Sequence, residues 1–230
     1  MDKQLIFITG GARSGKSRLA EQLAEQLGSW VLYIATGEPG DAEMVERIRC
    51  HRERRPAHWQ TLEAPRDVVP ALRMAMGKVD VVLLDCVSLW VSNLLLTYKL
   101  GVEELQTAVA TSAAVATADA VTELLSCFRE GAATFVIVSN EVGSGVVPPT
   151  SLGRLYRDIL GTVNQLVASA ADIVYYCVAG RVIDLSEAPT VGQFITTDVI
   201  TRSRSSSAHL LPSGEGRAKP NNPSEETHAQ

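Results

Sequence analysis

The sequence predicts an α/β domain whose mostly parallel sheet is covered by helices on both faces. Short runs rich in valine, isoleucine and leucine alternate along the chain with stretches whose apolar residues recur at helical spacing. This alternation is typical of parallel strands, because parallel neighbours need long crossover connections. The last two apolar runs are separated only by a short glycine-containing turn, which predicts an antiparallel hairpin near the C-terminus.

The strands are predicted from apolar runs bounded by turn residues. The first run, Leu5 to Thr9, ends at a glycine pair and reads as a buried strand. The last two runs flank Gly180 and form the predicted hairpin. The predicted strands are 5–9, 31–35, 79–84, 134–138, 173–178 and 181–185.

The helices are predicted from apolar residues three and four positions apart and from their end signals. Gly28 ends the first helix. Asp41 follows a polar turn and is predicted to cap the second helix, which runs to about Arg54 and ends before Pro56. The other predicted helices are 68–76, 152–170 and 102–128, the last being one long helix or a pair, and the first helix is 17–27.

The composition predicts one globular domain followed by a polar tail. The chain has 230 residues, of which 46% are hydrophobic and 20% charged, as in an ordinary globular protein. From about Thr201 arginine, serine, proline, asparagine and glutamate dominate. We predict a catalytic domain over 1–200 and a disordered tail over 201–230. The alternative for the tail is that its arginine–serine run is a contact or modification site.

Charge and hydropathy exclude several function classes. The net charge of −5 excludes a generally basic nucleic-acid coat, and we predict no nucleic-acid partner. No stretch of about 18 apolar residues lacks a charge, so no membrane span is predicted. The four cysteines are far apart and form no CxxC pair, which indicates reduced thiols in a cytoplasmic protein rather than a disulfide framework or a zinc site.

A phosphate-binding loop lies between the first strand and the first helix. The segment matches GxxxxGK[ST], in the strand-to-helix context that this motif requires. Backbone N–H groups of such a loop converge on phosphate oxygens, the lysine reaches the β- and γ-phosphates, and the serine hydroxyl can hold Mg²⁺. The loop residues are Gly10, Gly11, Ala12, Arg13, Ser14, Gly15, Lys16 and Ser17.

This loop predicts a P-loop NTPase fold of the RecA-like kind and a nucleotide ligand. The alternative is a glycine turn that binds nothing, which the full spacing and the correct flanks disfavour. The loop does not fix the reaction, because kinases, ATPases, GTPases and nucleotidyltransferases all use it. The Asn-Lys-x-Asp pattern that reads guanine in switch GTPases is absent from the chain, which disfavours that class.

A carboxylate stands at the end of a buried strand, where P-loop proteins hold their metal ion. Asp85 follows two leucines and resembles a Walker B position. The alternative is an aspartate that caps the next element. We predict that Ser17 and Asp85 bind Mg²⁺.

Five arginines surround His51 within nine residues of an acidic protein: Arg47, Arg49, Arg52, Arg54 and Arg55. Arginine forks match the geometry of phosphate, so the cluster favours an anionic ligand. The alternative is a solvated helix face balanced by nearby glutamates. His51 is either a packed interface histidine or a nucleophile, since neighbouring cations disfavour the imidazolium and neutral imidazole is the form that attacks phosphorus.

Several segments resemble the bifunctional adenosylcobinamide kinase / adenosylcobinamide-phosphate guanylyltransferase family of cobalamin biosynthesis. The most specific are Arg-Pro-Ala-His-Trp at 55–59 and Asn-Glu-Val-Gly-Ser-Gly-Val-Val-Pro at 140–148. The resemblance covers about residues 4–185 and leaves the polar tail outside. The resembling segments are 8–21, 31–36, 47–59, 139–148, 157–165 and 170–172.

The resemblance implies two reactions. The family phosphorylates the aminopropanol hydroxyl of adenosylcobinamide with ATP or GTP. It then transfers GMP from GTP to that phosphate, which gives adenosylcobinamide-GDP and pyrophosphate. The resemblance also implies a homo-oligomer, a trimer.

The resemblance assigns roles to individual residues of this chain. The histidine that carries GMP corresponds to His51, and Lys16 is the second catalytic residue. Nucleotide contacts carry over to the loop 10–17, Thr36, Arg54, Arg55, Glu63 and Asp85. At Asp85 the family often has glutamate, which is one methylene longer.

Two other hypotheses compete with the bifunctional enzyme. A single-activity P-loop small-molecule kinase would transfer only the γ-phosphate and would tolerate loss of His51. A nucleotide-gated RecA-like binding or assembly module would bind a macromolecule and turn over no small acceptor. Retention of GMP on the protein distinguishes the bifunctional enzyme from both the single-activity kinase and the binding module.

Overall fold

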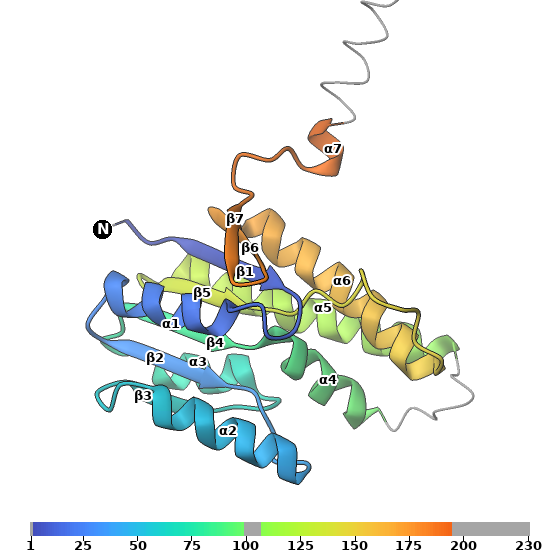
Figure 1. The fold of residues 1–230 in the computed structure, drawn as a ribbon, viewed down its shortest axis with the longest axis horizontal. Helices are drawn as coiled ribbons and strands as arrows, with labels where there is room; N and C mark the ends of the chain where they lie inside the picture. The colour runs from blue at the N-terminus through green and yellow to red at the C-terminus, as the bar shows by residue number, and fades with distance from the viewer. Residues whose placement is uncertain (1, 99–106, 195–230) are drawn as a thin grey trace, which may run out of the picture. The chain divides into compact units, whose positions relative to one another are not determined.

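We describe the protein from a computed structural model, in which residues 2–98 and 107–194 are described. The chain divides into two units, Met1–Ala188 and Pro189–Gln230. The first unit holds a seven-stranded sheet in the order β3-β2-β4-β5-β1-β6-β7 (Figure 1). In the second unit the structure describes one short helix, α7 (Val191–Phe194). The predicted tail, 201–230, lies outside the described residues.

Six strands run parallel, and β7 pairs antiparallel with β6. This arrangement confirms the predicted α/β fold with its C-terminal hairpin. Because the parallel strands point the same way, their carboxyl ends meet at one edge of the sheet, where ligands bind in open α/β folds. The strands are β1 (Leu5–Gly10), β2 (Val31–Ala35), β3 (Gln60–Glu63), β4 (Val81–Asp85), β5 (Thr134–Val138), β6 (Ile173–Val178) and β7 (Arg181–Asp184).

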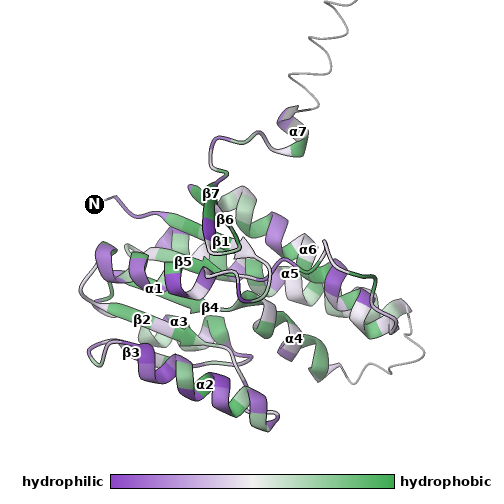
Figure 2. Ribbon diagram, in the orientation of Figure 1, coloured by the Kyte–Doolittle hydropathy of each residue, from purple (hydrophilic) through white to green (hydrophobic). Residues whose placement is uncertain are grey.

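The helices of the first unit form two layers. Alternate residues of each strand face opposite sides of the sheet. In β1, for example, Leu5 and Phe7 pack with α3 to α6, whereas Ile6 and Ile8 pack with α1. Figure 2 shows the central strands in the colours of apolar residues. The helices are α1 (Lys16–Leu27), α2 (Ala42–Arg54), α3 (Val68–Ala75), α4 (Val87–Thr97), α5 (Thr107–Glu130) and α6 (Ser151–Ala170).

Two elements of the first unit were not predicted, and each has a physical reason. The strand β3 reads Gln-Thr-Leu-Glu and is mostly exposed, so it carries no run of apolar residues, and its pairing with β2 defines it. The helix α4 is apolar on most sides, with Trp90, Val91 and Leu95 buried. Such a helix shows no clear period and cannot be told from a buried strand by pattern alone.

One helix has the length and hydropathy of a membrane span. This is α5, which overlaps the predicted helix 102–128, although residues 99–106 lie outside the described part of the chain. It packs against α3, α4 and α6, and its Val121 and Leu124 are fully buried. One face of α5 therefore packs within the domain, although only 28% of its apolar window is buried.

The turn of the β6–β7 hairpin places a strained residue beside the phosphate loop. Ala179 and Gly180 both have positive φ, 50° and 73°, as a two-residue type I′ turn requires. Gly180 N–H donates a hydrogen bond to the Ser14 carbonyl oxygen at 3.2 Å. The hairpin therefore supports the loop from outside, although alanine is a poor residue for this conformation.

Replacing Ala179 by asparagine is expected to stabilise the domain. Asparagine tolerates positive φ and completes an Asn-Gly turn, so we expect a gain of about 1 kcal/mol in the free energy of unfolding. In a domain of this size that gain raises Tm by about 2–4 °C. Calorimetry of Ala179→Asn checks this, with Ala179→Val as the control, because a β-branched residue lowers Tm if the strain is real.

Candidate active site

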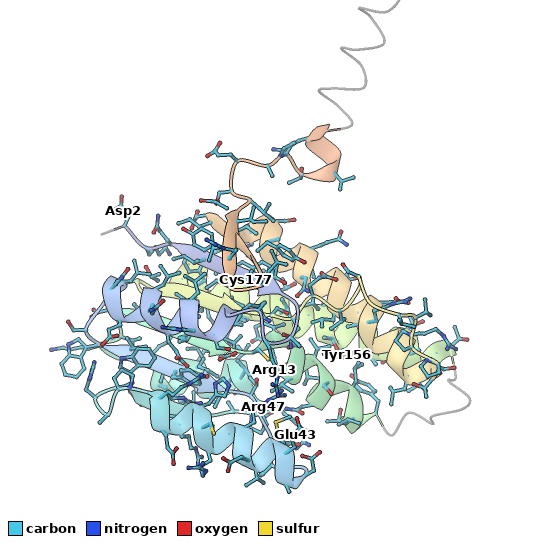
Figure 3. All side chains as sticks on the ribbon, viewed as in Figure 1. Asp2, Arg13, Glu43, Arg47, Tyr156 and Cys177 are labelled. Atoms are coloured by element: carbon cyan, nitrogen blue, oxygen red, sulfur yellow. The ribbon has the colours of Figure 1, made fainter. Side chains whose placement is uncertain are left out.

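A cavity of about 470 Å³ lies at the carboxyl edge of the sheet. The loop after β1 forms one wall, and the ends of β2, β3, β4 and β5 and the helix α2 form the others. Arg13 of the loop and Arg47 of α2 both line it (Figure 3). Of the residues singled out in the sequence, the cavity is lined by Ala12, Arg13, Ser14, Gly15, Lys16, Ser17, His51, Arg54, Arg55, Glu63 and Asp85.

The phosphate loop depends on glycine at two positions. Gly10 has φ 144°, and a Cβ there would overlap the carbonyl oxygen of Cys177 on the neighbouring strand β6. Gly15 has φ 103° and forms the N-cap of α1, where its carbonyl accepts the first helical hydrogen bond, from Leu19 N–H. The positive end of α1 therefore points at the space that the loop encloses.

Lys16 is held inside the loop. Its side chain is largely buried, and its Nζ donates to the Gly11 carbonyl oxygen at 2.6 Å. Burial lowers the pKa of Lys16, and the nearby groups Cys86, Asp85 and Cys177 oppose that shift. The ammonium thus stands where phosphate oxygens enter a P-loop.

Asp85 is anchored at the back of the cavity. The Tyr33 hydroxyl donates a hydrogen bond to Asp85 Oδ2 at 2.9 Å. The guanidinium carbon of Arg55 lies 3.6 Å from the centre of the Tyr33 ring, in a cation–π contact. Burial, and then the Asp85 charge, raises the pKa of Tyr33 well above its usual value, so the phenol stays protonated and can donate to the carboxylate.

His51 faces this carboxylate from α2. Asp41 caps the helix as predicted, since its Oδ1 accepts from Met44 N–H at 2.7 Å. His51 Nδ1 lies 3.9 Å from Asp85 Oδ2 and 3.2 Å from Arg54 Nη2. The imidazole therefore stands between the strand-end carboxylate and an arginine of its own helix.

Burial is the largest cause that lowers the pKa of His51. Arg54, Arg55 and Arg47 lower it further, and the Asp85 charge raises it. From the sequence, only the arginines were expected to disfavour the imidazolium of His51. The structure adds desolvation as the leading cause of its lowered pKa. The imidazole is thus neutral at pH 7, which is its nucleophilic form.

The arginine cluster divides into two groups. Arg47, Arg54 and Arg55 line the cavity. Arg49 instead forms ion pairs with Glu46 and Glu53 on the exposed face of α2, and Arg52 pairs with Glu63 at 2.7 Å. Arg49 thus belongs to a solvated helix face whose charges are balanced by glutamates. The position of the three cavity arginines fits binding of an anion.

Three predicted contact residues lie outside the cavity lining. Gly10 and Gly11 form the base of the loop. Thr36 is fully buried, and its hydroxyl both accepts from Cys86 N–H at 2.9 Å and donates to the Cys86 carbonyl oxygen at 2.8 Å. This pair of bonds ties the end of β2 to the end of β4, so the nucleotide contact of Thr36 stays a prediction.

Among the cavity residues to which the sequence analysis gave no individual role are Tyr33 and Asn140. Tyr33 sits inside an apolar strand. Its only signal in the sequence was its position, because successive residues of a strand face opposite sides of the sheet and Tyr33 therefore faces away from Ile34. Asn140 directly follows β5, and its Nδ2 donates to Ser88 Oγ at 2.8 Å. Its signal was a polar residue at a strand end on the ligand-binding edge of a parallel sheet.

The donor set at the cavity suits a magnesium ion. Ser17 and Asp85 line the same cavity, and Mg²⁺ usually takes one or two carboxylates while phosphates and waters complete its shell. Within 2–98 and 107–194, no group of three or more histidine, cysteine, aspartate or glutamate residues could hold a metal ion. All four cysteines are free.

The geometry combines a triphosphate cradle with a neutral imidazole in one cavity. Such a site can bind a nucleoside triphosphate and present a nucleophile to phosphorus. The arginines on the same wall can neutralise a second anion.

Comparison with known proteins agrees with this chemistry. The "Bifunctional adenosylcobalamin biosynthesis protein CobP" of Pseudomonas aeruginosa is 43% identical over 186 residues, which are 80% of this chain and 98% of the relative. The "Bifunctional adenosylcobalamin biosynthesis protein CobU" of Salmonella typhimurium is 42% identical over 179 residues, 76% of this chain and 96% of the relative. The protein of the same name in Escherichia coli is 42% identical over 176 residues, with the same coverage of 76% and 96%. The model of a family described as "Cobinamide kinase / cobinamide phosphate guanyltransferase" matches residues 6–185.

The family match begins at the second residue of β1 and includes the rest of the sheet, the phosphate loop and the helix that carries His51. All the residues that line the cavity therefore lie within the matched region. This chain belongs to the cobinamide kinase / cobinamide phosphate guanyltransferase family.

Proposed function

We propose that this protein performs two successive reactions in one cavity. It phosphorylates the aminopropanol hydroxyl of adenosylcobinamide with ATP or GTP, and it then transfers GMP from GTP to that phosphate. The products of the second reaction are adenosylcobinamide-GDP and pyrophosphate. The observation that carries the proposal is that the phosphate loop and His51 line the same cavity.

Guanylyl transfer divides into two displacements at the α-phosphorus. A ring nitrogen of His51 attacks in line, so that an N–P bond forms and the bond to pyrophosphate breaks. A phosphate oxygen of adenosylcobinamide phosphate then attacks the same phosphorus, and the N–P bond breaks to return His51. A covalent intermediate divides one difficult transfer between anions into two easier steps.

Charge on the phosphates is met by groups already in place. Lys16 and the loop N–H groups face the leaving pyrophosphate, and Arg54 and Arg55 face the incoming phosphate. Ser17 and Asp85 would hold Mg²⁺, which neutralises charge on the phosphate oxygens when it is bound.

The kinase step places the γ-phosphorus against a hydroxyl, and a carboxylate can accept the proton. The candidates are two carboxylates near strand ends, Asp85 of β4 and Glu141 after β5. Asp85 lines the cavity, whereas Glu141 Oε1 accepts from Gly143 N–H at 2.5 Å within its own loop.

Covalent trapping tests the proposed function. The full-length protein is incubated with α-labelled GTP, denatured and washed. Label that stays on the protein, is lost in acid and survives alkali is the signature of a phosphoramidate. A native protein that retains no label contradicts guanylyl transfer and leaves a single-activity kinase or a binding module.

A trimer in the cytoplasm completes the proposal. The helix α2 buries no residue within the chain and exposes Val45, so a neighbouring subunit can cover it. The free cysteines fit a reducing compartment. Light scattering should give three times the 24.7 kDa chain mass, and a monomeric mass for the active enzyme contradicts the assembly.

A further inference from the structure

The helix that carries His51 is weakly attached to the body of the domain. None of the residues of α2 is fully buried, although Met44, Ile48 and His51 are half-buried, and Figure 2 shows the helix mostly in the colour of hydrophilic residues with some apolar bands. Apolar packing alone therefore holds this helix weakly, and polar contacts at its last turn help to position the imidazole. One of these contacts comes from α1, the helix that follows the phosphate loop.

Glu21 is that contact. It lies one helical turn after Ser17, on the same face of α1. Its side chain is only 16% exposed, and its Oε1 is buried without a hydrogen bond. The nearest cation is Arg54, whose Nη2 lies 3.5 Å from this oxygen. A buried carboxylate is costly unless a cation compensates it, so this pair constrains Arg54.

The same nitrogen of Arg54 faces the reacting imidazole. Arg54 Nη2 lies 3.5 Å from Glu21 Oε1 and 3.2 Å from His51 Nδ1. Half of the Arg54 side chain is exposed, so without Glu21 the guanidinium could move into solvent. A chain of polar contacts thus runs from Glu21 on the phosphate-loop helix through Arg54 to the imidazole.

We propose that Glu21 is a positioning residue for guanylyl transfer, acting through Arg54 to hold the His51 ring beside the phosphate loop. The inference rests on the proposed function. It predicts a selective effect, because the kinase reaction uses the loop and Asp85 but not the imidazole. Small errors in the placement of a reacting group slow a reaction strongly.

The test compares Glu21→Gln with Glu25→Gln in the full-length protein. Glu25 lies one turn further along α1 and borders the same hollow of about 360 Å³ between α1 and the 54–59 segment. Unlike Glu21, it is exposed. Glu21→Gln keeps the size of the side chain and removes the charge that pairs with Arg54. Glu25→Gln makes the same change one helical turn away from that pair.

We expect Glu21→Gln to slow single-turnover labelling by α-labelled GTP roughly tenfold. Phosphorylation of adenosylcobinamide by γ-labelled ATP should stay within about threefold of wild type, since this step makes no use of His51. Glu25→Gln should leave both rates unchanged. Glu21→Asp keeps the charge and should recover part of the labelling rate.

A second comparison tests the route through Arg54. In an Arg54→Gln background, the added Glu21→Gln should cause no further loss of labelling, because coupled residues are not additive. Equal loss of both activities, no loss of labelling, or multiplied losses in the double variant would each overturn the inference. Absence of label from the wild type would instead overturn the proposed function.

Discussion

Replacing His51 by alanine is expected to abolish labelling by α-labelled GTP while leaving phosphorylation of adenosylcobinamide within about threefold of wild type. In the proposed mechanism the imidazole forms the bond to phosphorus, so its removal leaves no covalent intermediate. It lies on α2, which buries no residue, so the variant should fold normally. The measurement is retained label beside kinase turnover on the same preparation.

His58 provides the matched control for this variant. It is an exposed histidine seven residues further on, outside the cavity lining. His58→Ala should label like the wild type. Label that survives in His51→Ala would place the covalent site elsewhere and contradict the assigned nucleophile.

Lys16→Ala should lower both activities by about 10²–10³, which corresponds to about 3–4 kcal/mol of transition-state stabilisation. Both reactions need positive charge where the phosphates develop charge, and the Lys16 ammonium is held inside the loop by the Gly11 carbonyl oxygen. The measurements are kcat and KM for adenosylcobinamide phosphorylation and the single-turnover rate of labelling.

Two further variants separate this effect from damage to the fold. Lys78 is exposed and distant from the cavity lining, and Lys78→Ala should behave like the wild type. Lys16→Arg keeps the charge, and its Tm shows whether the loop tolerates a change at this position. A Lys16→Ala enzyme that folds and loses only one activity would mean that the two reactions do not share the loop.

The sequence sufficed for the elements whose pattern is local. The phosphate loop is recognised because spacing and flanks act within a few residues, and the strands around it are short apolar runs. Where an element depends on distant partners, no local pattern exists. The exposed strand β3 is defined by β2, and α4 is apolar on most sides, so its period is hidden.

The site shows the same division. His51 could be suspected from the arginines beside it, but its approach to Asp85 joins residues on α2 and β4, and only the fold brings them together. The contact of Tyr33 with Asp85 and that of Glu21 with Arg54 are likewise between separate elements. Desolvation of His51, the main cause of its lowered pKa, also arises only when these elements pack.

The placement of the nucleophile on a helix that buries no residue has an evolutionary consequence. The central sheet and the phosphate loop do not depend on α2 for their packing, so substitutions on that helix leave the scaffold intact. Under the proposed mechanism, transfer of the nucleotide can therefore be retuned or lost by substitution on α2 while the phosphate loop and sheet persist. The two proposed chemistries would share one cavity, yet they would depend on parts of the molecule that can diverge at different rates.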